Sequence, residues 1–196
     1  MTQIIIFNQS MRTKGFTLVE LMVVVAIVSL LSSIVSVSLS TARSKGRDAQ
    51  RITEIRQLQG ALELYYLQYG HYPLSLNCNA NTPNNLWCNS VESLHYSGVW
   101  VRDSGVKGIL VPQFITHEPI DPSQTTSVNW PPVGGRTYFY FSDGYGGSGQ
   151  WYMIVYGLEN PNNALESSDG VIAPNGTYFH YGNGINGIIT VGRSTR

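Results

Sequence analysis

An uncharged apolar run near the amino terminus limits what this chain can fold into. From Leu21 to Ala42, 22 consecutive residues include no Asp, Glu, Lys, Arg, Pro or Gly. A helix of this length extends about 30 Å, at about 1.5 Å per residue, which matches the hydrocarbon thickness of a bilayer. The run therefore predicts a helix that can span a membrane.

A single carboxylate, that of Glu20, stands at the amino-terminal edge of this run. It belongs to the string GFTLVE, residues 15–20, which follows the basic residues Arg12 and Lys14. A charged side chain at membrane depth costs on the order of 2.5–3.5 kcal/mol on insertion scales, so such a residue marks a functional position. Glu20 is therefore a candidate functional residue that needs a cationic partner.

The string GFTLVE, entered from basic residues and followed by an apolar helix, resembles the class III signal of type IV prepilins and pseudopilins. The resemblance implies that a membrane-embedded prepilin peptidase cuts after Gly15, so that residues 1–15 are a cleaved leader. It implies methylation of the new amino terminus at Phe16. It also implies that Glu20 serves assembly by neutralising the cationic amine of a neighbouring subunit, a pair that low dielectric strengthens.

Two simpler interpretations of the same segment stay open. A secretory signal peptide has an apolar region of about 7–15 residues and small residues at its cleavage site. Ser32, Ser33 and Ser36 offer such a site, although the apolar stretch is longer here and Glu20 interrupts it. An uncleaved signal anchor requires only the apolar run.

Basic residues are more frequent after the apolar run than before it. By the positive-inside bias alone, this asymmetry would place the carboxyl-terminal part in the cytoplasm. The resemblance and the two cysteines favour the opposite orientation, with the basic residues beside the outer headgroups. There we also expect contacts with carboxylates of neighbouring subunits. The basic residues are Arg43, Lys45, Arg47 and Arg51, and the carboxylates are Asp48 and Glu54.

A second helical pattern follows the apolar run. Apolar residues recur at spacings of three and four up to Tyr69, as in an amphipathic helix with one face against a sheet. Gly70 suits a carboxyl-terminal cap, and Pro73 cannot continue a helix. We therefore expect a membrane or filament-core helix over 16–42 and an amphipathic helix over 43–70.

Residues 71–196 are predicted to form an extracytoplasmic domain of loops and an antiparallel sheet. The stretch 77–106 is expected to be a variable loop, because it is rich in Asn and Ser. The resemblance favours a turn within 108–122. Together these features predict an α+β pilin fold, a long helix packed on a small antiparallel sheet. Strands are expected at 136–142, 150–157, 177–181 and 187–191.

Composition limits the partners and the compartment. Twelve basic and twelve acidic residues leave no formal net charge, so nucleic acid is not expected as a default partner. The two cysteines, Cys78 and Cys88, lie ten residues apart in a loop-like stretch. They predict a disulfide in an oxidising compartment, worth about 2–3 kcal/mol on the chain-entropy model.

The sequence contains no evident catalytic constellation. Its four histidines lack metal-ligand spacing, and no HExxH, GxSxG or P-loop string occurs. Asp143 and Asp169 lie in glycine-flanked turns, which ordinary turn chemistry explains. The resemblance implies calcium in the sheet loops of major pseudopilins, so these two residues are the candidates for a calcium site. We otherwise expect no cofactor and no enzymatic activity.

The turn at 70–73 and the Asp121-Pro122 segment are similar to those of the major pseudopilin of type II secretion systems. The resemblance implies a structural subunit held in the inner membrane by one helix, with its carboxyl-terminal domain outside the cytoplasm. The subunit would then polymerise with itself into a filament, in the periplasm or at the cell surface. The implied partners are the prepilin peptidase, an inner-membrane assembly platform, and minor pilins or pseudopilins.

Three alternative functions remain at this stage. A type IV pilin for adhesion, motility or DNA uptake belongs to the same filament class, and the predicted loop disulfide favours it. A membrane-tethered binding module would use Trp87, Trp100 and Trp130 as a carbohydrate-binding surface. An anchored hydrolase would need a nucleophile and a base, which the sequence pattern does not supply.

Overall fold

The chain divides into two units, residues 1–42 and residues 43–196. One helix, α1 (Leu18–Tyr69), contributes to both. The computed structural model describes residues 15–75, 87–90, 102–103, 106–107, 110–111, 113–117, 119–125, 127–128, 130–160, 170–182 and 187–194.

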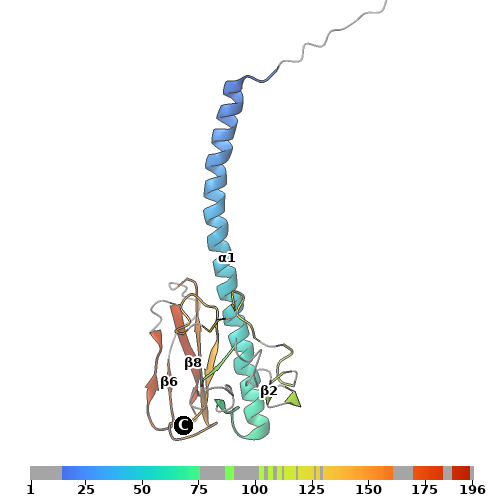
Figure 1. Ribbon diagram of the computed structural model, residues 1–196. Helices are drawn as coiled ribbons and strands as arrows, with labels where there is room; N and C mark the ends of the chain where they lie inside the picture. Colours follow the sequence, from blue (N-terminus) through green and yellow to red (C-terminus); the bar gives the residue numbers. More distant parts are fainter. Residues whose placement is uncertain are drawn as a thin grey trace, which may run out of the picture. The chain divides into compact units, whose positions relative to one another are not determined.

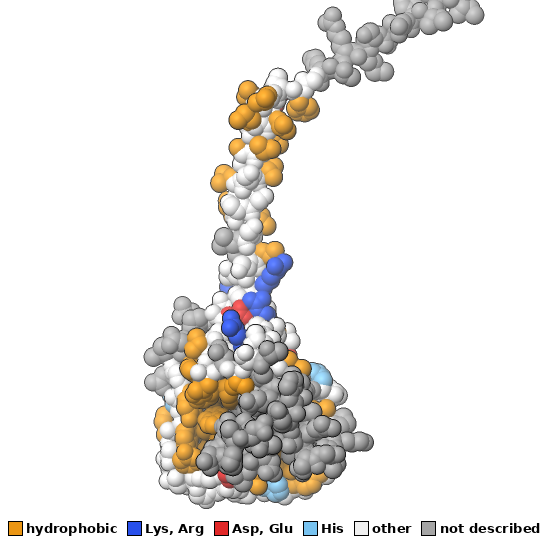
Figure 2. All heavy atoms as spheres, viewed as in Figure 1, with side chains coloured by type: hydrophobic (Ala, Val, Ile, Leu, Met, Phe, Trp, Pro, Cys, Tyr) orange, Lys and Arg blue, Asp and Glu red, His pale blue; other side chains and the backbone are white. Residues whose placement is uncertain are grey.

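The described part of the amino-terminal unit is helical from Leu18 onward, and its apolar side chains are exposed in the isolated chain (Figure 2). By length and composition, α1 can cross a membrane, and its most apolar window has a mean hydropathy of 2.6. An apolar surface of this kind is stable only when lipid or other helices cover it.

In the carboxyl-terminal unit, α1 ends where the sequence predicts. The helix stops at Tyr69, and Gly70 has a positive φ of 73°. The Gly70 amide donates to the carbonyl of Tyr66 at 2.8 Å. A left-handed residue after the last turn favours glycine, which lacks the Cβ that would clash, so the predicted cap at Gly70 is confirmed.

A four-stranded antiparallel sheet lies alongside α1 in this unit, in the order β1-β4-β5-β8 (Figure 1). Two further antiparallel pairs, β2-β3 and β6-β7, complete the described strands. The α+β pilin fold predicted from the sequence is confirmed. The strands are β1 (Cys88–Asn89), β2 (Arg102–Asp103), β3 (Val106–Lys107), β4 (Phe139–Phe141), β5 (Trp151–Gly157), β6 (Val171–Ile172), β7 (Tyr178–Phe179) and β8 (Ile188–Ser194).

The central strand β5 is buried along its whole length. Alternate side chains of a strand point to opposite faces, and here both faces are covered. One face packs against apolar side chains of α1, and the other packs against a layer of aromatic rings. The helix contributes Ile52, Ile55, Leu58 and Leu62, which confirms most of the predicted amphipathic face. The aromatic layer comprises Trp87, Trp130, Phe139, Phe141, Trp151, Phe179 and Tyr181.

The prediction that 77–106 is a loop is wrong at its described strands. Strand β1 adds to the sheet edge beside β4, β2 lies within the same stretch, and β3, which pairs with β2, begins at its last residue, Val106. Each of the three is two residues long, so alternation of apolar and polar residues cannot reveal them. Their pairing with distant or neighbouring strands creates them. The short strand β6 was also missed, while the strands expected at 136–142, 150–157, 177–181 and 187–191 correspond to β4, β5, β7 and β8.

Gly157, at the end of β5, is required by a close backbone approach. A Cβ at this position would lie 1.6 Å from the carbonyl oxygen of Pro132. We expect Gly157→Ala to lower the free energy of unfolding by about 1–3 kcal/mol, because the loop must move away from the strand. Urea unfolding of the full chain in detergent, followed by tryptophan fluorescence, measures this loss.

Gly60 provides the matched control. It lies within α1, and a Cβ there would meet nothing within 4 Å. Gly60→Ala should therefore raise stability by about 0.5–1 kcal/mol through helix propensity. Equal effects of the two substitutions would show that the contact between Gly157 and Pro132 is unimportant.

Candidate assembly segment and the buried Arg51 cluster

Thr17 and Glu20 form a reciprocal cap at the start of α1. The backbone amide and the hydroxyl of Thr17 both donate to Oε2 of Glu20, at 2.9 and 2.8 Å. The amide of Glu20 donates to the Thr17 hydroxyl at 3.2 Å. This is a capping box, in which the pattern T-x-x-E satisfies amides that lack a helical partner. The cap fixes the first turn of the helix at Leu18.

The capping role of Glu20 was missed in the sequence analysis, although its signal, T-x-x-E before an apolar run, is present at residues 17–20. Within the part of the chain that the structure describes, the carboxylate is held by hydrogen bonds from Thr17, and no described cation contacts it. These bonds orient the carboxylate on the first turn, and its charge is not neutralised. It remains able to accept a cation from another subunit.

Gly15 and Phe16 precede the helix in irregular, exposed backbone. Phe16 is 88% exposed, and a Cβ on Gly15 would meet nothing within 4 Å. The bond between these two residues is therefore accessible in the isolated chain. Cleavage and methylation at this bond stay predictions.

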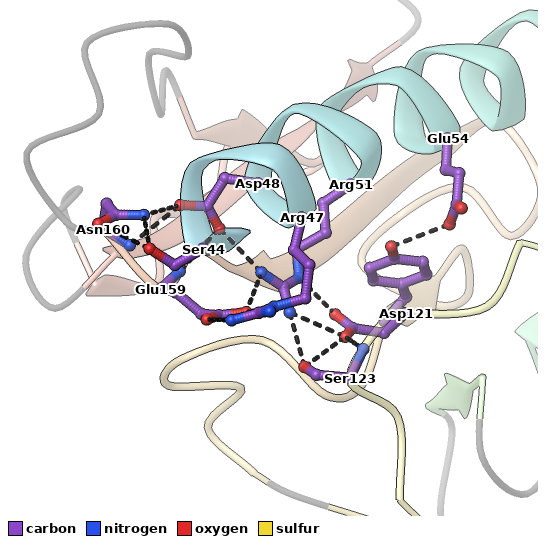
Figure 3. Close-up of polar contacts among 10 residues, drawn as sticks. Ser44, Arg47, Asp48, Arg51, Glu54, Asp121, Ser123, Glu159 and Asn160 are labelled. Atoms are coloured by element: carbon purple, nitrogen blue, oxygen red, sulfur yellow. Dashed lines mark hydrogen bonds and ion pairs between the residues drawn. The ribbon is translucent and has the colours of Figure 1, made fainter. Parts of the chain in front are cut away.

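Arg51 is the centre of a buried ionic cluster on α1, shown in Figure 3. Its side chain has no exposed surface. Nη1 lies 2.8 Å from Oδ1 of Asp48 and 2.8 Å from Oε1 of Glu159. On the other edge, Nε and Nη2 donate to the two carboxylate oxygens of Asp121 at 2.8 and 3.0 Å. Nη2 also donates to the hydroxyl of Ser123 at 2.6 Å.

Asp48 extends this cluster, which we call the Arg51 cluster, to the segment after β5. Its carboxylate accepts hydrogen bonds from the backbone amides of Glu159 and Asn160, at 2.8 and 3.0 Å. It also accepts one from the side-chain amide of Asn160 at 2.7 Å. Arg47 pairs with Glu159 at the exposed rim. The cluster therefore joins α1 to two segments far away in the sequence, residues 121–123 and residues 159–160.

The charges in the cluster stabilise one another. Burial lowers the pKa of the Arg51 guanidinium, but its hydrogen bonds to Asp121, Glu159 and Asp48 outweigh that effect and raise the pKa overall. The hydrogen bond from Arg47 lowers the pKa of the Glu159 carboxyl, although partial burial opposes it. Arg51 is thus permanently cationic, and its buried charge requires these carboxylates.

Gly135 lies directly on the guanidinium of Arg51. It has a positive φ of 88°, and a Cβ there would come within 2.4 Å of Nη2 of Arg51. The amide of Gly135 donates to the carbonyl of Pro132 at 3.2 Å. Only a residue without a side chain allows the loop to cover the cluster at this distance.

These contacts correct the expected role of the junction charges. Asp48 and Arg51 are fully buried and paired within the chain, and Arg47 pairs with Glu159. Glu54 accepts hydrogen bonds from Gln50 and Tyr138 of the same chain. Asp48 and Arg51 are three residues apart and Gln50 and Glu54 four, but the contacts that bury the cluster join α1 to residues about 70 to 110 positions away, which no local pattern marks.

The ion pair of Glu159 predicts an acid-dependent loss of stability. Because the pKa of Glu159 in the folded chain is below its ordinary value of 4.5, its contribution is complete above that value. The contribution is lost as the pH falls through the lower folded-state pKa. We expect Glu159→Gln to reduce the steepness of this loss, measured by urea unfolding between about pH 7 and pH 3.

Arg47→Gln should reduce the steepness in the same direction, because the Arg47 hydrogen bond is the largest cause of the lowered pKa. The double variant should then resemble Glu159→Gln alone. Identical pH profiles for the wild type and both single variants would contradict this account of the pair.

The other predicted site residues are only partly described. Cys88 is buried in β1, and none of the described cysteines is free, but Cys78 lies outside the described residues, so the disulfide stays a prediction. Asp143 is buried in the loop between β4 and β5, and Asp169 lies outside the described residues. Among the residues that the structure describes, no three His, Cys, Asp or Glu side chains form a metal-binding group. Calcium binding stays untested.

The aromatic residues considered for carbohydrate binding have separate places. Trp87 is half-buried and its ring lies 5.2 Å from that of Trp130. Trp130 is 47% exposed and packs edge-on against Phe139. Trp100 lies outside the described residues. Trp87 and Trp130 therefore cover the outer face of the sheet.

Comparison with known proteins identifies the amino-terminal segment. Residues 10–36 match the family described as "Prokaryotic N-terminal methylation motif", and this range contains both the predicted cut site and the capped Glu20. The amino-terminal segment of the chain is thus similar to that of type IV pilins and pseudopilins. The resemblance predicted from GFTLVE is confirmed for this segment.

Curated relatives agree with this assignment. The chain is 37% identical to type II secretion system core protein G of Escherichia coli over 62 residues, which are 32% of this chain and 43% of the relative. It is 37% identical to the Aeromonas hydrophila protein of the same name over 65 residues, 33% of this chain and 46% of the relative. The Vibrio cholerae protein is 41% identical over 62 residues, 32% of this chain and 42% of the relative.

The match thus spans less than half the length of these relatives. No solved structure matches the chain with significance.

Proposed function

We propose that this protein is a structural subunit of a type II secretion pseudopilus, most similar in role to the major pseudopilin. The observation that carries the proposal is a methylation motif at residues 10–36 leading into a helix that can cross a membrane. Similarity to core protein G of several secretion systems supports the secretion role. The subunit has no enzymatic activity in this proposal.

The proposed mechanism begins in the inner membrane. The apolar part of α1 holds the subunit there as a single-pass protein, with the carboxyl-terminal unit outside the cytoplasm. Prepilin peptidase removes residues 1–15, and the new amine of Phe16 is methylated and stays cationic. Glu20, oriented by Thr17, then pairs with the amine of an adjacent subunit in a medium of low dielectric.

Assembly follows from the exposed apolar surface. The described apolar side chains between Phe16 and Leu39 are exposed in the isolated chain and leave lipid by packing against copies of the same helix. Because lipid is as apolar as these side chains, packing alone gives little register specificity, whereas a charge pair at one position does. The assembly platform and minor pseudopilins are the further partners of this step.

Gly15→Ala tests the processing step. Coexpressed with a prepilin peptidase, the wild type should be converted to a chain of 181 of its 196 residues, with a methylated amino terminus. The variant should remain full-length in the membrane. Intact-mass spectrometry distinguishes the two products.

Gly46→Ala provides a matched control, because Gly46 lies in α1 and a Cβ there would meet nothing within 4 Å. It should be cut as the wild type is. Normal processing of Gly15→Ala would contradict the leader assignment.

The secretion role needs a separate test in the native host. Deleting the gene should leave folded secreted enzymes in the periplasm, and the wild-type gene should restore their release. A deletion strain that secretes normally but loses surface filaments, motility or DNA uptake would instead identify a type IV pilin. The predicted disulfide between Cys78 and Cys88 favours that second candidate.

A further inference from the structure

Arg43 and Lys45 differ from the other cations at the start of the carboxyl-terminal unit. Both are exposed, and within the described parts of the chain neither has an ion-pair or hydrogen-bond partner. Arg47 and Arg51, one and two turns further along α1, are bound in the Arg51 cluster. The folded chain therefore leaves this first pair of cations available to an external anion.

The position of these cations suits a membrane surface. Arg43 follows directly on the 22-residue run without charges. Because successive residues of a helix are rotated by about 100°, Arg43 and Lys45 project from nearly opposite sides of α1. Figure 2 shows basic side chains (blue) gathered on this part of the helix. Cations on opposite sides suit a surrounding layer of anions better than they suit a single protein face.

Neighbouring helices offer little charge to these cations. Glu20 stands at the other end of the apolar run, and in the proposed function it pairs with the amine of an adjacent subunit. The other carboxylates of α1 already have a partner within their own chain, and the buried Asp48 cannot reach another subunit. These pairs are Asp48 with Arg51, Glu54 with Tyr138, and Glu63 with Arg193. An anion from outside the protein is the better complement for Arg43 and Lys45.

We propose that Arg43 and Lys45 form a headgroup collar that binds the phosphate groups of anionic phospholipids at the outer face of the membrane. The inference rests on the proposed function, which places the apolar run in the bilayer. An arginine guanidinium matches phosphate through two parallel hydrogen bonds, and a lysine ammonium acts as a point charge. The collar sets the depth of the subunit before assembly, and assembly must release these lipids.

Lipid selectivity of the full chain tests the collar. The purified protein is exchanged into mixed micelles with equimolar phosphatidylglycerol and phosphatidylcholine, and the bound lipids are counted by native mass spectrometry. We expect the wild type to prefer phosphatidylglycerol. Arg43→Gln/Lys45→Gln should lose this preference by about fivefold or more, since each cation near an anionic surface changes affinity by about fivefold. High salt should weaken the preference of the wild type.

Two control variants distinguish lipid binding at the collar from a general effect of net charge. Arg43→Lys/Lys45→Arg keeps both charges and should retain the preference. Arg136→Gln removes one exposed cation from a loop of the same unit and should also retain it. An unchanged preference in the double glutamine variant overturns the proposal, and so does an equal loss in Arg136→Gln. Normal lipid preference with impaired filament assembly in the double glutamine variant would assign the pair to a neighbouring subunit instead.

Failure of membrane anchoring is measured independently. Wild type and the double glutamine variant should both resist extraction of membranes with alkaline carbonate, because the apolar run is intact in both. Release of the wild type by carbonate would overturn the anchoring on which the collar depends. Resistance to carbonate without phosphatidylglycerol preference would overturn the collar alone.

Discussion

Arg51→Ala is expected to lower the free energy of unfolding by about 3–5 kcal/mol, a large share of the stability of a typical domain. Removing the guanidinium leaves Asp48 and Asp121 buried without their shared cation. It also leaves a cavity beneath Gly135. Urea unfolding of the full chain in detergent, followed by tryptophan fluorescence, measures the loss.

Arg51→Lys tests whether the positive charge of Arg51 is enough or whether the geometry of its guanidinium is also needed. Lysine keeps the cation but cannot donate in a fork to Asp121 and at the same time reach Asp48 and Ser123. We expect an intermediate loss of stability. Arg51→Asp would place four carboxylates together, and the chain should fail to fold. Full stability of Arg51→Ala would contradict the role given to the cluster, because the carboxylates would then need no cation.

Glu20→Ala is expected to reduce assembled filaments by about 100-fold or more, while processing at Gly15 continues. Breaking one partner of a charge pair in a low-dielectric environment costs about 3–5 kcal/mol, which is a factor of more than 100 in an equilibrium. Quantitative immunoblotting of sheared or cross-linked filaments, normalised to the mature subunit in the membrane, measures the effect.

Glu20→Gln is the informative companion. Glutamine at this position can keep the capping box with Thr17 but carries no charge. If the charge pairs with a neighbour's amine, Glu20→Gln should assemble as poorly as Glu20→Ala. If the residue serves only to start α1, Glu20→Gln should assemble as the wild type does. Normal assembly of Glu20→Ala would contradict both roles.

The parts of the structure that depend on local patterns could be predicted from the sequence. Spacings of three and four residues indicated the buried face of α1, Gly70 indicated its end, and aromatic-rich runs indicated β4 and β5. The string GFTLVE indicated the family of the amino-terminal segment. In each case the physical cause lies within a few neighbouring residues.

The Arg51 cluster could not be predicted in the same way. A charged stretch after an apolar run has the appearance of a solvated surface, and burial of Arg51 depends on carboxylates from residues 121 and 159. The glycine that covers it, Gly135, lies in a loop with no pattern of its own. Strand β1 exists only because it pairs with β4. These features depend on contacts between distant segments, which only the folded chain brings together.

Intact-mass spectrometry of filaments purified from the native host tests the central claim most directly. The account predicts that the main species begins at methylated Phe16 and contains 181 residues. Its mass should be two units lower than that of the reduced chain if the predicted disulfide is present. Filaments that contain only the uncut chain, or that lack this protein while it stays uncut in the membrane, would contradict the account.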